Sequence, residues 1–377
     1  MQWISAFSCG VLSEKRSYRA EIYLPLLEKI KYDSYFDLEI IAFGTHLSKV
    51  HGYTISEIVN DGYKTIHQIT SLISDDSEDS IATSYALTTL KFSDFWKENK
   101  FDFVLCLGDR FEMSAAVQAG IVFRVNFVHI HGGETTLGAI DNIYRHQITL
   151  ASKIHIAATK VFSKKIAQLI GTSNSVHTVG SLSLDNINNF KPLEKHNFFK
   201  KFKISMNEFA LATFHPETVN IENNELFSIE MSKVLEEISK KITVVITMPN
   251  ADTMGSIYRR QINMLKLAYP DRIICIENFG KKNCFSAMYY SSFLIGNTSS
   301  GIIEAATFEK YVVNVGDRQK GRLQSKNIIN AKFDFSDMMK SVDMALSLKE
   351  FKGINLYYQK DSVKKFIYLL KSYNETI

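Results

Sequence analysis

Residues 129–146, HIHGGETTLGAIDNIYRH, bring three histidines, a glutamate, an aspartate and an arginine together behind a short apolar run. Alternation along a strand would place His129 and His131 on one face, with Glu134 directly after a glycine pair. Such groups suit proton transfer, because crowding or burying carboxylates raises their affinity for protons. The alternative is a metal site formed by the two histidines and Glu134, but no third histidine or cysteine stands at the usual spacing.

Two further carboxylates stand at expected helix starts. Asp109 follows the strand expected at 102–107, and Asp141 precedes the helical run that carries Arg145 and His146. A plain N-cap would explain either carboxylate, and a surface ion pair would explain Arg145. Their shared position after strands favours a site instead, with Arg145 and His146 as substrate-binding side chains, because ligands of parallel sheets bind beyond the carboxyl ends of the strands.

The second half of the chain offers groups suited to phosphate. The segment 296–306, GNTSSGIIEAA, runs from a strand into a helix, and its hydroxyl groups and backbone N–H groups could hold an anion. The residues concerned are Thr298, Ser299, Ser300 and Gly301. Glu304 follows about one turn later, where a carboxylate could bind ribose hydroxyls. An ordinary capped core helix is the alternative, and the segment lacks the lysine of a Walker sequence.

Other strand ends in this half carry similar chemistry. His215 follows the strand in EFALATFHPET, and Arg318 follows the strand in YVVNVGDRQKGR. Asn250 and Asp252 end the strand in ITVVITMPNAD and could contact a base or ribose. None of these residues indicates a site by itself, but all of them directly follow a strand, and this shared position favours a nucleotide site.

Short apolar runs alternate with helical patterns along the whole chain, as in βαβ units with buried parallel sheets. The expected strands are 2–8, 38–43, 102–107, 125–130, 153–158 and 176–180, then runs beginning near 207, 242, 272, 292 and 311. The expected helices include 77–99, 111–121, 223–240, 299–308 and 363–373. The fold class is therefore α/β, with two doubly wound, Rossmann-like domains.

The expected domains are 1–185, with the carboxylates, and 186–358, with the nucleotide groups. Residues 359–377 should form a helix that packs back on the first domain. The domain join lies in the region 181–205, which has no strong period.

Composition narrows the functional class. The chain has 377 residues, 45% hydrophobic and 22% charged, which is ordinary for a globular protein with two cores. A net charge of +4 is too weak to indicate nucleic acid. No apolar run is long enough for a membrane span and the N-terminus lacks a basic leader, so a cytoplasmic protein that binds a small molecule is expected.

The ordered motifs between about residues 100 and 325 resemble those of the hydrolysing UDP-N-acetylglucosamine 2-epimerases of sialic-acid biosynthesis. They are LGDRFEM, HIHGGETTLGAIDNIYRH, FHPETVN, PNADTMGS, GNTSSGIIEAA and NVGDRQKGR. The family also includes enzymes acting on the diacetamido-trideoxy sugar that leads to legionaminic acid. The resemblance implies a fold like that of GT-B glycosyltransferases, with substrate in a cleft between two domains, and a homodimer.

The implied reaction removes the C2 proton, expels the nucleoside diphosphate to give a 2-acetamidoglycal, and adds water at C1 with reprotonation of C2 on the opposite face. It needs no NAD and no essential metal, so no cofactor is expected.

The resemblance also implies residue roles. Asp109, Glu134 and Asp141 would be the acid and base carboxylates, with His131 nearby, and their separate roles stay open. Contacts to the diphosphate would come from His215, Ser299, Ser300 and Arg318, to the ribose from Glu304, and to the nucleotide sugar from Arg110 and Asn250. The turn after the first strand departs from the family pattern, so either Arg16 or Arg19 could align with the phosphate-contacting arginine.

Three alternatives remain open from the sequence. A non-hydrolysing 2-epimerase and a GT-B glycosyltransferase would share the fold, and a nucleotide-sugar sensor would bind without turnover. The choice between UDP and GDP and the modification of the sugar are open as well.

Overall fold

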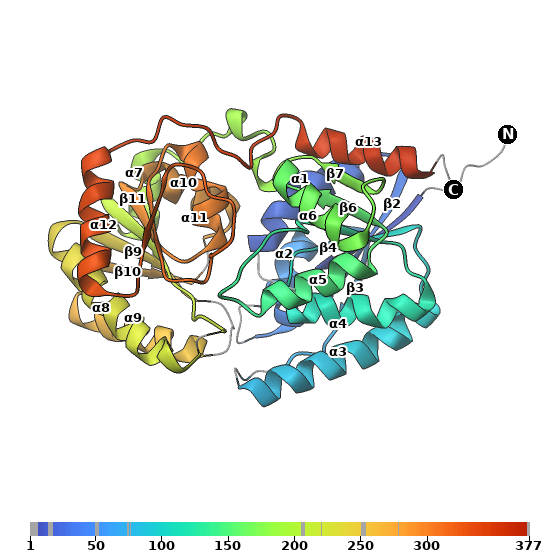
Figure 1. Cartoon of the computed structure of the whole chain (residues 1–377), viewed down its shortest axis with the longest axis horizontal. Coiled ribbons are helices and arrows are strands. Elements are labelled where there is room, and N and C mark those ends of the chain that lie inside the picture. Colours follow the sequence, from blue (N-terminus) through green and yellow to red (C-terminus); the bar gives the residue numbers. More distant parts are fainter. Residues whose placement is uncertain are drawn as a thin grey trace. The chain divides into compact units, whose positions relative to one another are not determined.

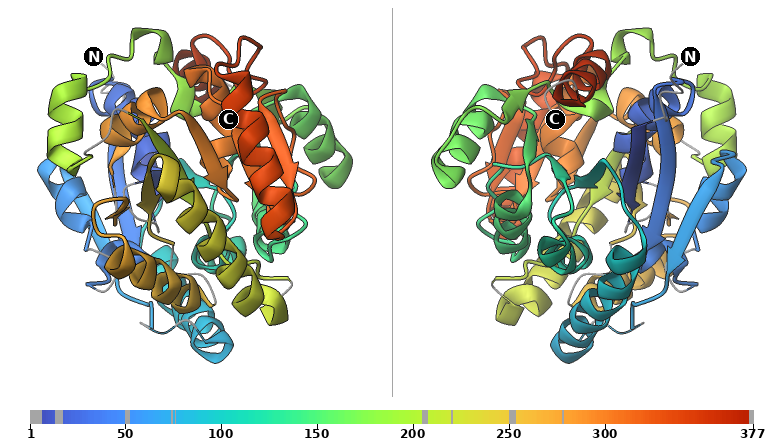
Figure 2. Two further views of the ribbon diagram at one scale, coloured as in Figure 1. Left: turned by 90° about the vertical axis from the view of Figure 1, so that its left-hand side faces the viewer. Right: turned by 90° about the vertical axis from the view of Figure 1, so that its right-hand side faces the viewer.

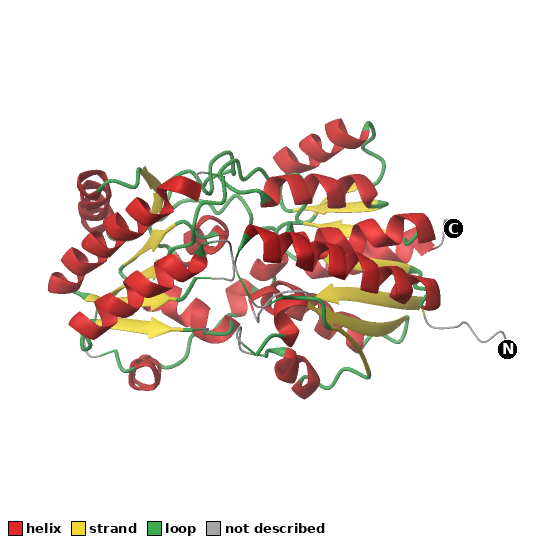
Figure 3. Cartoon of the chain, turned by 90° about the horizontal axis from the view of Figure 1, so that it is seen from below, coloured by secondary structure: helices red, strands yellow, loops and turns green. Residues whose placement is uncertain are grey.

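The computed structural model describes residues 7–13, 18–49, 53–73, 75, 77–204, 208–219, 221–249, 254–277 and 279–374. The chain forms two compact units (Figure 1). Unit 1 comprises Met1–Glu134, Asp141–Asn186 and Tyr357–Ile377, and unit 2 comprises Thr135–Ile140 and Ile187–Leu356. Each unit has a parallel sheet between helices (Figures 2 and 3), so the predicted α/β class with two doubly wound sheets is confirmed.

The sheet of unit 1 has the strand order β3-β2-β1-β4-β5-β6-β7, and every pairing is parallel. The strands are β1 (Phe7–Ser13), β2 (Phe36–Phe43), β3 (Thr65–Ile69), β4 (Phe103–Leu107), β5 (Phe127–Ile130), β6 (Ile154–Ala157) and β7 (Val176–Thr178). Strands β4 and β5 are buried throughout, as strands covered on both faces must be. The order changes direction between β1 and β4, which makes that pair the topological switch point.

Helices cover both faces of this sheet. They are α1 (Tyr18–Lys31), η1 (Gly44–Leu47), α2 (Ile55–Asn60), α3 (Glu78–Glu98), α4 (Phe111–Gly120), η2 (Ile121–Phe123), α5 (Asp141–Ala151), α6 (Lys160–Ile170), η3 (Leu182–Leu184) and α13 (Ser362–Asn374). Helix α3 begins where the Ser77 hydroxyl accepts a hydrogen bond from the backbone N–H of Ser80, and it buries Phe92 and Trp96. Helix α13 contributes Phe366 and Leu370 to the core that α1 also lines.

The sheet of unit 2 has the order β10-β9-β8-β11-β12-β13, again entirely parallel. Its strands are β8 (Phe209–Thr213), β9 (Thr243–Thr247), β10 (Ile273–Ile276), β11 (Phe293–Gly296), β12 (Val312–Val315) and β13 (Ile328–Ala331). The helices are η4 (Ile187–Asn189), α7 (Lys195–Phe202), η5 (Ile221–Asn223), α8 (Asn224–Lys241), α9 (Gly255–Ala268), α10 (Lys281–Tyr290), α11 (Ser299–Ile303), η6 (Ala305–Phe308) and α12 (Phe335–Leu348). This sheet changes direction between β8 and β11, whose carboxyl ends carry predicted site residues.

A short segment of the amino-terminal half belongs to unit 2. We call residues 135–140 the strap. The backbone N–H of Leu137 donates to the carbonyl of Lys320 at 2.9 Å. Gly138 packs so tightly that a Cβ atom there would lie 2.3 Å from the carbonyl oxygen of Asp317. The strap is therefore anchored to the turn after β12, which the sequence analysis did not predict.

The first strand ends later than the sequence indicated. A strand was expected at residues 2–8, of which 2–6 lie outside the described residues, but β1 runs on to Ser13. Gly10 lies inside the strand, where a Cβ atom would come within 3.1 Å of the Phe101 ring. Helix α1 begins at Tyr18, and residues 14–17 before it lie outside the described residues.

No helix in the described part of the chain combines the length and the apolar character that crossing a bilayer requires.

Candidate active site

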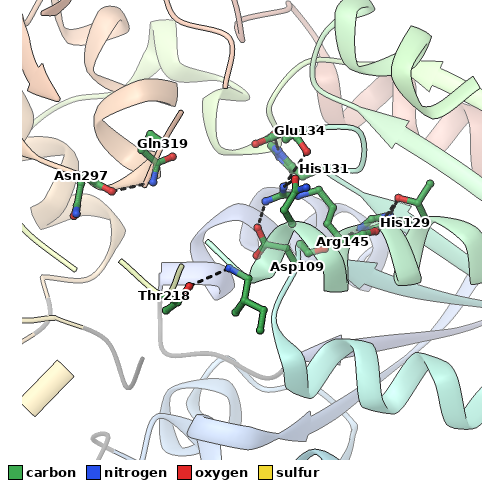
Figure 4. Close-up of polar contacts among 12 residues, drawn as sticks. Asp109, His129, His131, Glu134, Arg145, Thr218, Asn297 and Gln319 are labelled. Atoms are coloured by element: carbon green, nitrogen blue, oxygen red, sulfur yellow. Dashed lines mark hydrogen bonds and ion pairs between the residues drawn. The ribbon is translucent and has the colours of Figure 1, made fainter. Parts of the chain in front are cut away.

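The carboxyl ends of β4 and β5 carry a network centred on the buried side chain of Arg145. The Arg145 guanidinium, from α5, forms an ion pair with the carboxylate of Asp109, which follows β4 (Figure 4). Arg145 is 1% exposed, and its Nη1 also donates to the backbone oxygen of Glu134 at 2.9 Å. Because a buried guanidinium needs partners to offset its desolvation, this side chain holds the end of β4 and the loop after β5 together.

His131 and Glu134 form a second pair beside this ion pair. His131 Nδ1 and Glu134 Oε1 are 2.8 Å apart, and both side chains are buried. The other ring nitrogen, Nε2, is also buried and has no hydrogen-bond partner among the described residues. A carboxylate at Nδ1 favours the tautomer with its proton there and leaves the Nε2 lone pair available. Glu134 thus orients the His131 imidazole, whose Nε2 can accept or return a proton.

The expectation that His129 and His131 share a face is wrong. Strand alternation ends at Ile130, because His131 has a φ of 65°, in the left-handed region. The His129 ring is buried instead between Thr149 Oγ1, at 3.0 Å from Nδ1, and the Gly108 carbonyl, at 2.8 Å from Nε2. Burial lowers the pKa of His129 to about 3. Since both of its nitrogens are engaged, His129 is a structural residue, and the alternative metal site loses a ligand.

Asp141 and His146 lie on the same helix as Arg145. Asp141 is the first residue of α5 and is half-buried. His146 is also half-buried, and its Nδ1 has no hydrogen-bond partner within the described residues. Burial, together with the positive charges of Arg145 and Lys165, lowers the pKa of His146, so its ring stays neutral near pH 7.

Arg110 has a partner that the sequence analysis missed. Its Nε and Nη2 atoms donate to the two oxygens of Glu112 at 3.0 and 3.3 Å, and both side chains are buried. Burial, followed by electrostatic interaction with Tyr85, Asp141 and Glu112, raises the pKa of Tyr144. Glu112 and Tyr144 therefore belong to the same surroundings as Asp141, although neither stands in a recognisable motif.

In unit 2, Asn297 links the carboxyl ends of β8 and β11. Its Oδ1 accepts a hydrogen bond of 2.7 Å from the His215 backbone N–H, and its Nδ2 donates to the His215 carbonyl at 2.8 Å. Asn297 is fully buried and His215 is 5% exposed. This reciprocal pair fixes the backbone that carries the His215 side chain.

The turn after β12 is attached to the same asparagine. The backbone oxygen of Asn297 accepts from Arg318 Nη1 at 3.3 Å and from Gln319 Nε2 at 2.9 Å. Gln319 is 2% exposed, and its Oε1 has no hydrogen-bond partner among the described residues. Gln319 is a site candidate that the sequence did not indicate, because its position depends on this tertiary contact with Asn297.

The carboxylate of Glu217 holds this turn from the other side. Glu217 Oε1 accepts from the Asp317 backbone N–H at 2.6 Å, and Glu217 is 1% exposed. Close by, the Ile140 backbone N–H at the end of the strap donates to Thr218 Oγ1 at 3.0 Å (Figure 4). The HPET segment after β8 therefore supports both the turn that bears Arg318 and the strap.

The segment 298–304 forms a shorter helix than expected. Helix α11 has five residues and begins where the Thr298 hydroxyl accepts from the Ser300 backbone N–H. Ser300 Oγ is buried without a hydrogen-bond partner among the described residues, and Glu304, at the helix end, is 1% exposed. Gly301 allows close packing on Val312, because a Cβ atom would lie 3.0 Å from it. Ser299 is half-buried beside them.

Several predicted contacts fall outside the described residues. These are Arg16, Asn250 and Asp252, and also the side chain of Arg19, whose backbone lies in α1. The predicted phosphate and nucleotide roles of these four residues stay predictions.

Comparison with known proteins identifies the family. The family described as UDP-N-acetylglucosamine 2-epimerase matches residues 28–371 of this sequence. The chain belongs to this family. The resemblance seen in the ordered motifs is thereby confirmed.

Relatives within the 2-epimerase family match nearly the whole chain. GDP/UDP-N,N'-diacetylbacillosamine 2-epimerase (hydrolyzing) of Campylobacter jejuni is 34% identical over 89% of this chain and 86% of its own length. UDP-N,N'-diacetylbacillosamine 2-epimerase (hydrolyzing) of Legionella pneumophila is 28% identical over 92% and 91%. Polysialic acid biosynthesis protein P7 of Escherichia coli is 26% identical over 92% and 90%. The expectation that the chain is an enzyme, a nucleotide-sugar 2-epimerase, is confirmed by these matches.

Solved structures of 2-epimerases share the fold. The crystal structure of UDP-GlcNAc 2-epimerase from Neisseria meningitidis bound to UDP-GlcNAc superposes with a TM-score of 0.78 at 15% identity, covering 97% of this chain and all of that one. A 2-epimerase structure from Listeria monocytogenes gives 0.77 at 14% identity, covering 99% and 98%. These likenesses confirm the GT-B-like, two-unit α/β fold.

Proposed function

We propose that this 2-epimerase is hydrolysing. It would convert UDP-N-acetylglucosamine, or a related UDP or GDP 2-acetamido sugar such as the diacetamido-trideoxy sugar, and water into the free manno-configured sugar and nucleoside diphosphate. The observation that carries this proposal is the network that joins half-buried Asp109 to the buried side chains of Arg145, Glu134 and His131. The two relatives whose names include the word hydrolyzing support the outcome.

The chemistry requires two proton-transfer groups. A base removes the C2 proton, the C1–O bond to the diphosphate breaks, and a 2-acetamidoglycal forms. Water then adds its hydroxyl at C1 while an acid returns a proton to C2 on the opposite face. Because removal and return occur on opposite faces, one residue cannot serve both steps.

The network offers these two groups as separately held side chains. The first is His131 with Glu134, an imidazole whose Nε2 has no other hydrogen-bond partner in the described chain. The second is Asp109, held by Arg145. Asp141, at the start of α5, is a third carboxylate for the same chemistry. Arg145, predicted to contact substrate, acts in this proposal as a positioning residue, because its guanidinium already binds Asp109 and the Glu134 backbone.

Unit 2 would hold the nucleotide. His215, Thr298, Ser299, Ser300, Gly301 and Arg318 are proposed for the diphosphate, and Glu304 for the ribose. The buried hydroxyl of Ser300 supports this assignment, because in the described chain it lacks a protein partner. The nucleotide-sugar contacts proposed for Arg110 and His146 come from unit 1.

The reaction in heavy water tests the proposal. A panel of UDP and GDP 2-acetamido sugars is incubated with the protein and followed by proton NMR. We expect free nucleoside diphosphate and a manno-configured sugar with one solvent deuteron at C2. Release without deuterium would contradict the elimination route, and C2 inversion in an intact nucleotide sugar would identify a non-hydrolysing enzyme.

The product also suggests a biological use. A free manno-configured 2-acetamido sugar is a precursor for nonulosonic acids, and the name of the Escherichia coli relative supports sialic-acid-type synthesis. The predicted homodimer belongs to the same proposal, and analytical ultracentrifugation tests it.

A further inference from the structure

The switch point of the first sheet has a polar side chain that the proposed mechanism does not use. Strand β1 pairs with β4 in a register that sets Val11 opposite Leu105, and β1 ends at Ser13. Ser13 therefore ends one of the two strands at which the order changes direction, and Asp109 follows the other. In doubly wound sheets ligands bind beside this pair of strand ends.

Ser13 begins a chain of three buried side chains. Its Oγ lies 2.7 Å from His46 Nε2, and His46 Nδ1 lies 2.8 Å from Thr54 Oγ1. His46 belongs to η1 after β2, and Thr54 directly precedes α2. The exposed fractions of Ser13, His46 and Thr54 are 6%, 0% and 4%.

This arrangement leaves hydrogen-bonding capacity at Ser13. Burial lowers the pKa of His46 to about 4, so near pH 7 its ring is neutral, with one N–H donor and one acceptor. When the Thr54 hydroxyl donates to Nδ1, the Nε2–H group donates to Ser13 Oγ. The Ser13 O–H hydrogen is then directed away from His46, which is the only hydrogen-bond partner of this hydroxyl among the described residues.

We propose that the Ser13 hydroxyl donates a hydrogen bond to a diphosphate oxygen of the nucleotide sugar, and that His46 and Thr54 are positioning residues that orient it. The inference rests on the proposed function and adds a contact to it. The diphosphate is favoured because Ser13 directly precedes the first βα turn, the place where doubly wound folds receive phosphate groups. A neutral donor there would stabilise the charge that develops as the diphosphate leaves.

Titration calorimetry with UDP, GDP, uridine and guanosine tests the contact without requiring turnover. Ser13→Ala should bind the preferred diphosphate about 10-fold more weakly, the loss of one charge-assisted hydrogen bond, and should bind the nucleoside unchanged. The matched control is Ser71→Ala. Ser71 is 2% exposed and accepts a hydrogen bond of 2.7 Å from Thr88 Oγ1, but it follows the edge strand β3. This control should leave diphosphate affinity unchanged.

A double-mutant cycle tests the positioning role. Thr54→Val should weaken diphosphate binding about 3-fold in the natural sequence and not at all when Ser13 is already alanine, because Thr54 acts only through Ser13. Ser13→Thr, which keeps a hydroxyl, should recover most of the affinity. Equal effects of Thr54→Val in both backgrounds would overturn the positioning role.

Other outcomes would overturn the contact itself. They are unchanged diphosphate affinity in Ser13→Ala, equal weakening of diphosphate and nucleoside, or a protein that binds neither UDP nor GDP. A protein that binds diphosphate normally but fails to turn over any sugar of the panel would contradict the proposed function alone.

Discussion

Arg145 is the residue on which the arrangement of the carboxylates depends. Arg145→Lys keeps the charge, but a single ammonium cannot reproduce the planar fork that binds Asp109 and the Glu134 carbonyl together. We expect a fall in kcat of about 100-fold and a loss of about 2–4 kcal/mol in the free energy of unfolding. Steady-state assays and urea unfolding measure both quantities.

A matched control is available at the surface of unit 2. Arg259 pairs with Glu277 at 2.8 Å, and these side chains are 30% and 50% exposed. Arg259→Lys should change the free energy of unfolding by less than about 1 kcal/mol and leave kcat unchanged. A kcat near that of the natural protein in Arg145→Lys would contradict the positioning role.

His131 is the second residue whose role can be isolated. His131→Gln should lower the rate of deuterium incorporation at C2 by about 100-fold or more, because an amide cannot act as a general acid or base. Nucleoside diphosphate binding should persist, since the residues proposed for that contact lie elsewhere. NMR exchange and titration calorimetry separate the two effects, and parallel losses in both would point to misfolding instead of lost proton transfer.

The sequence predicted which types of side chain gather in the site, but not how they bind each other. Asp109, Glu134 and His131 do join one network, as strand-end logic suggested. His129 points away from His131 because His131 has a left-handed φ, which the alternation of strand residues does not predict. Gln319 and Glu112 were not predicted as site residues, because their place in the site depends on contacts with Asn297 and Arg110.

The close packing of the strap on the turn after β12 depends on Gly138. Gly138→Ala would push a methyl group into the Asp317 carbonyl, 2.3 Å away, so the strap or the turn that bears Arg318 must shift. We expect a loss of about 1–3 kcal/mol in the free energy of unfolding. The KM for the nucleotide sugar should rise as well, and assays with chemical unfolding measure both. Leu137→Ala is the control, because that side chain is 55% exposed while its backbone hydrogen bond to Lys320 remains.

Most elements could be predicted because their apolar runs are buried on both faces. The expected helices at 77–99 and 363–373 match α3 and α13. Strand β3, TIHQI, was missed because an edge strand is only partly covered and its sequence lacks a continuous apolar run. The first strand was expected to end at residue 8, although β1 continues through Gly10, where a glycine allows close packing against Phe101.

For the whole molecule, buried neutral histidines predict acid sensitivity. Burial lowers the pKa of His46 and His155 to about 4 and that of His129 to about 3, from the ordinary 6.5. The unfolded chain therefore binds protons first as the pH falls below about 6.5, and folding stability declines down to the folded pKa values. At about pH 5 each histidine should remove about 2 kcal/mol relative to pH 8. Urea unfolding between these pH values measures the loss, and constant stability would contradict it.

Membership of the 2-epimerase family and the two α/β units could be predicted from motif order and periodicity. The cleft between the domains, the homodimer and the identity of base and sugar remain predictions. The contacts predicted for Arg16, Asn250 and Asp252 stay predictions as well, because these residues lie outside the described part of the chain.

The path of the chain through the strap limits how the protein can be dissected. A fragment of residues 187–356 would include every strand of the second sheet, yet it would lack the strap. The Lys320 carbonyl and the Thr218 hydroxyl would then face solvent without their native donors. Unit 2 is thus not a continuous piece of sequence, and a working excised version would need the missing hexapeptide supplied in trans or grafted on.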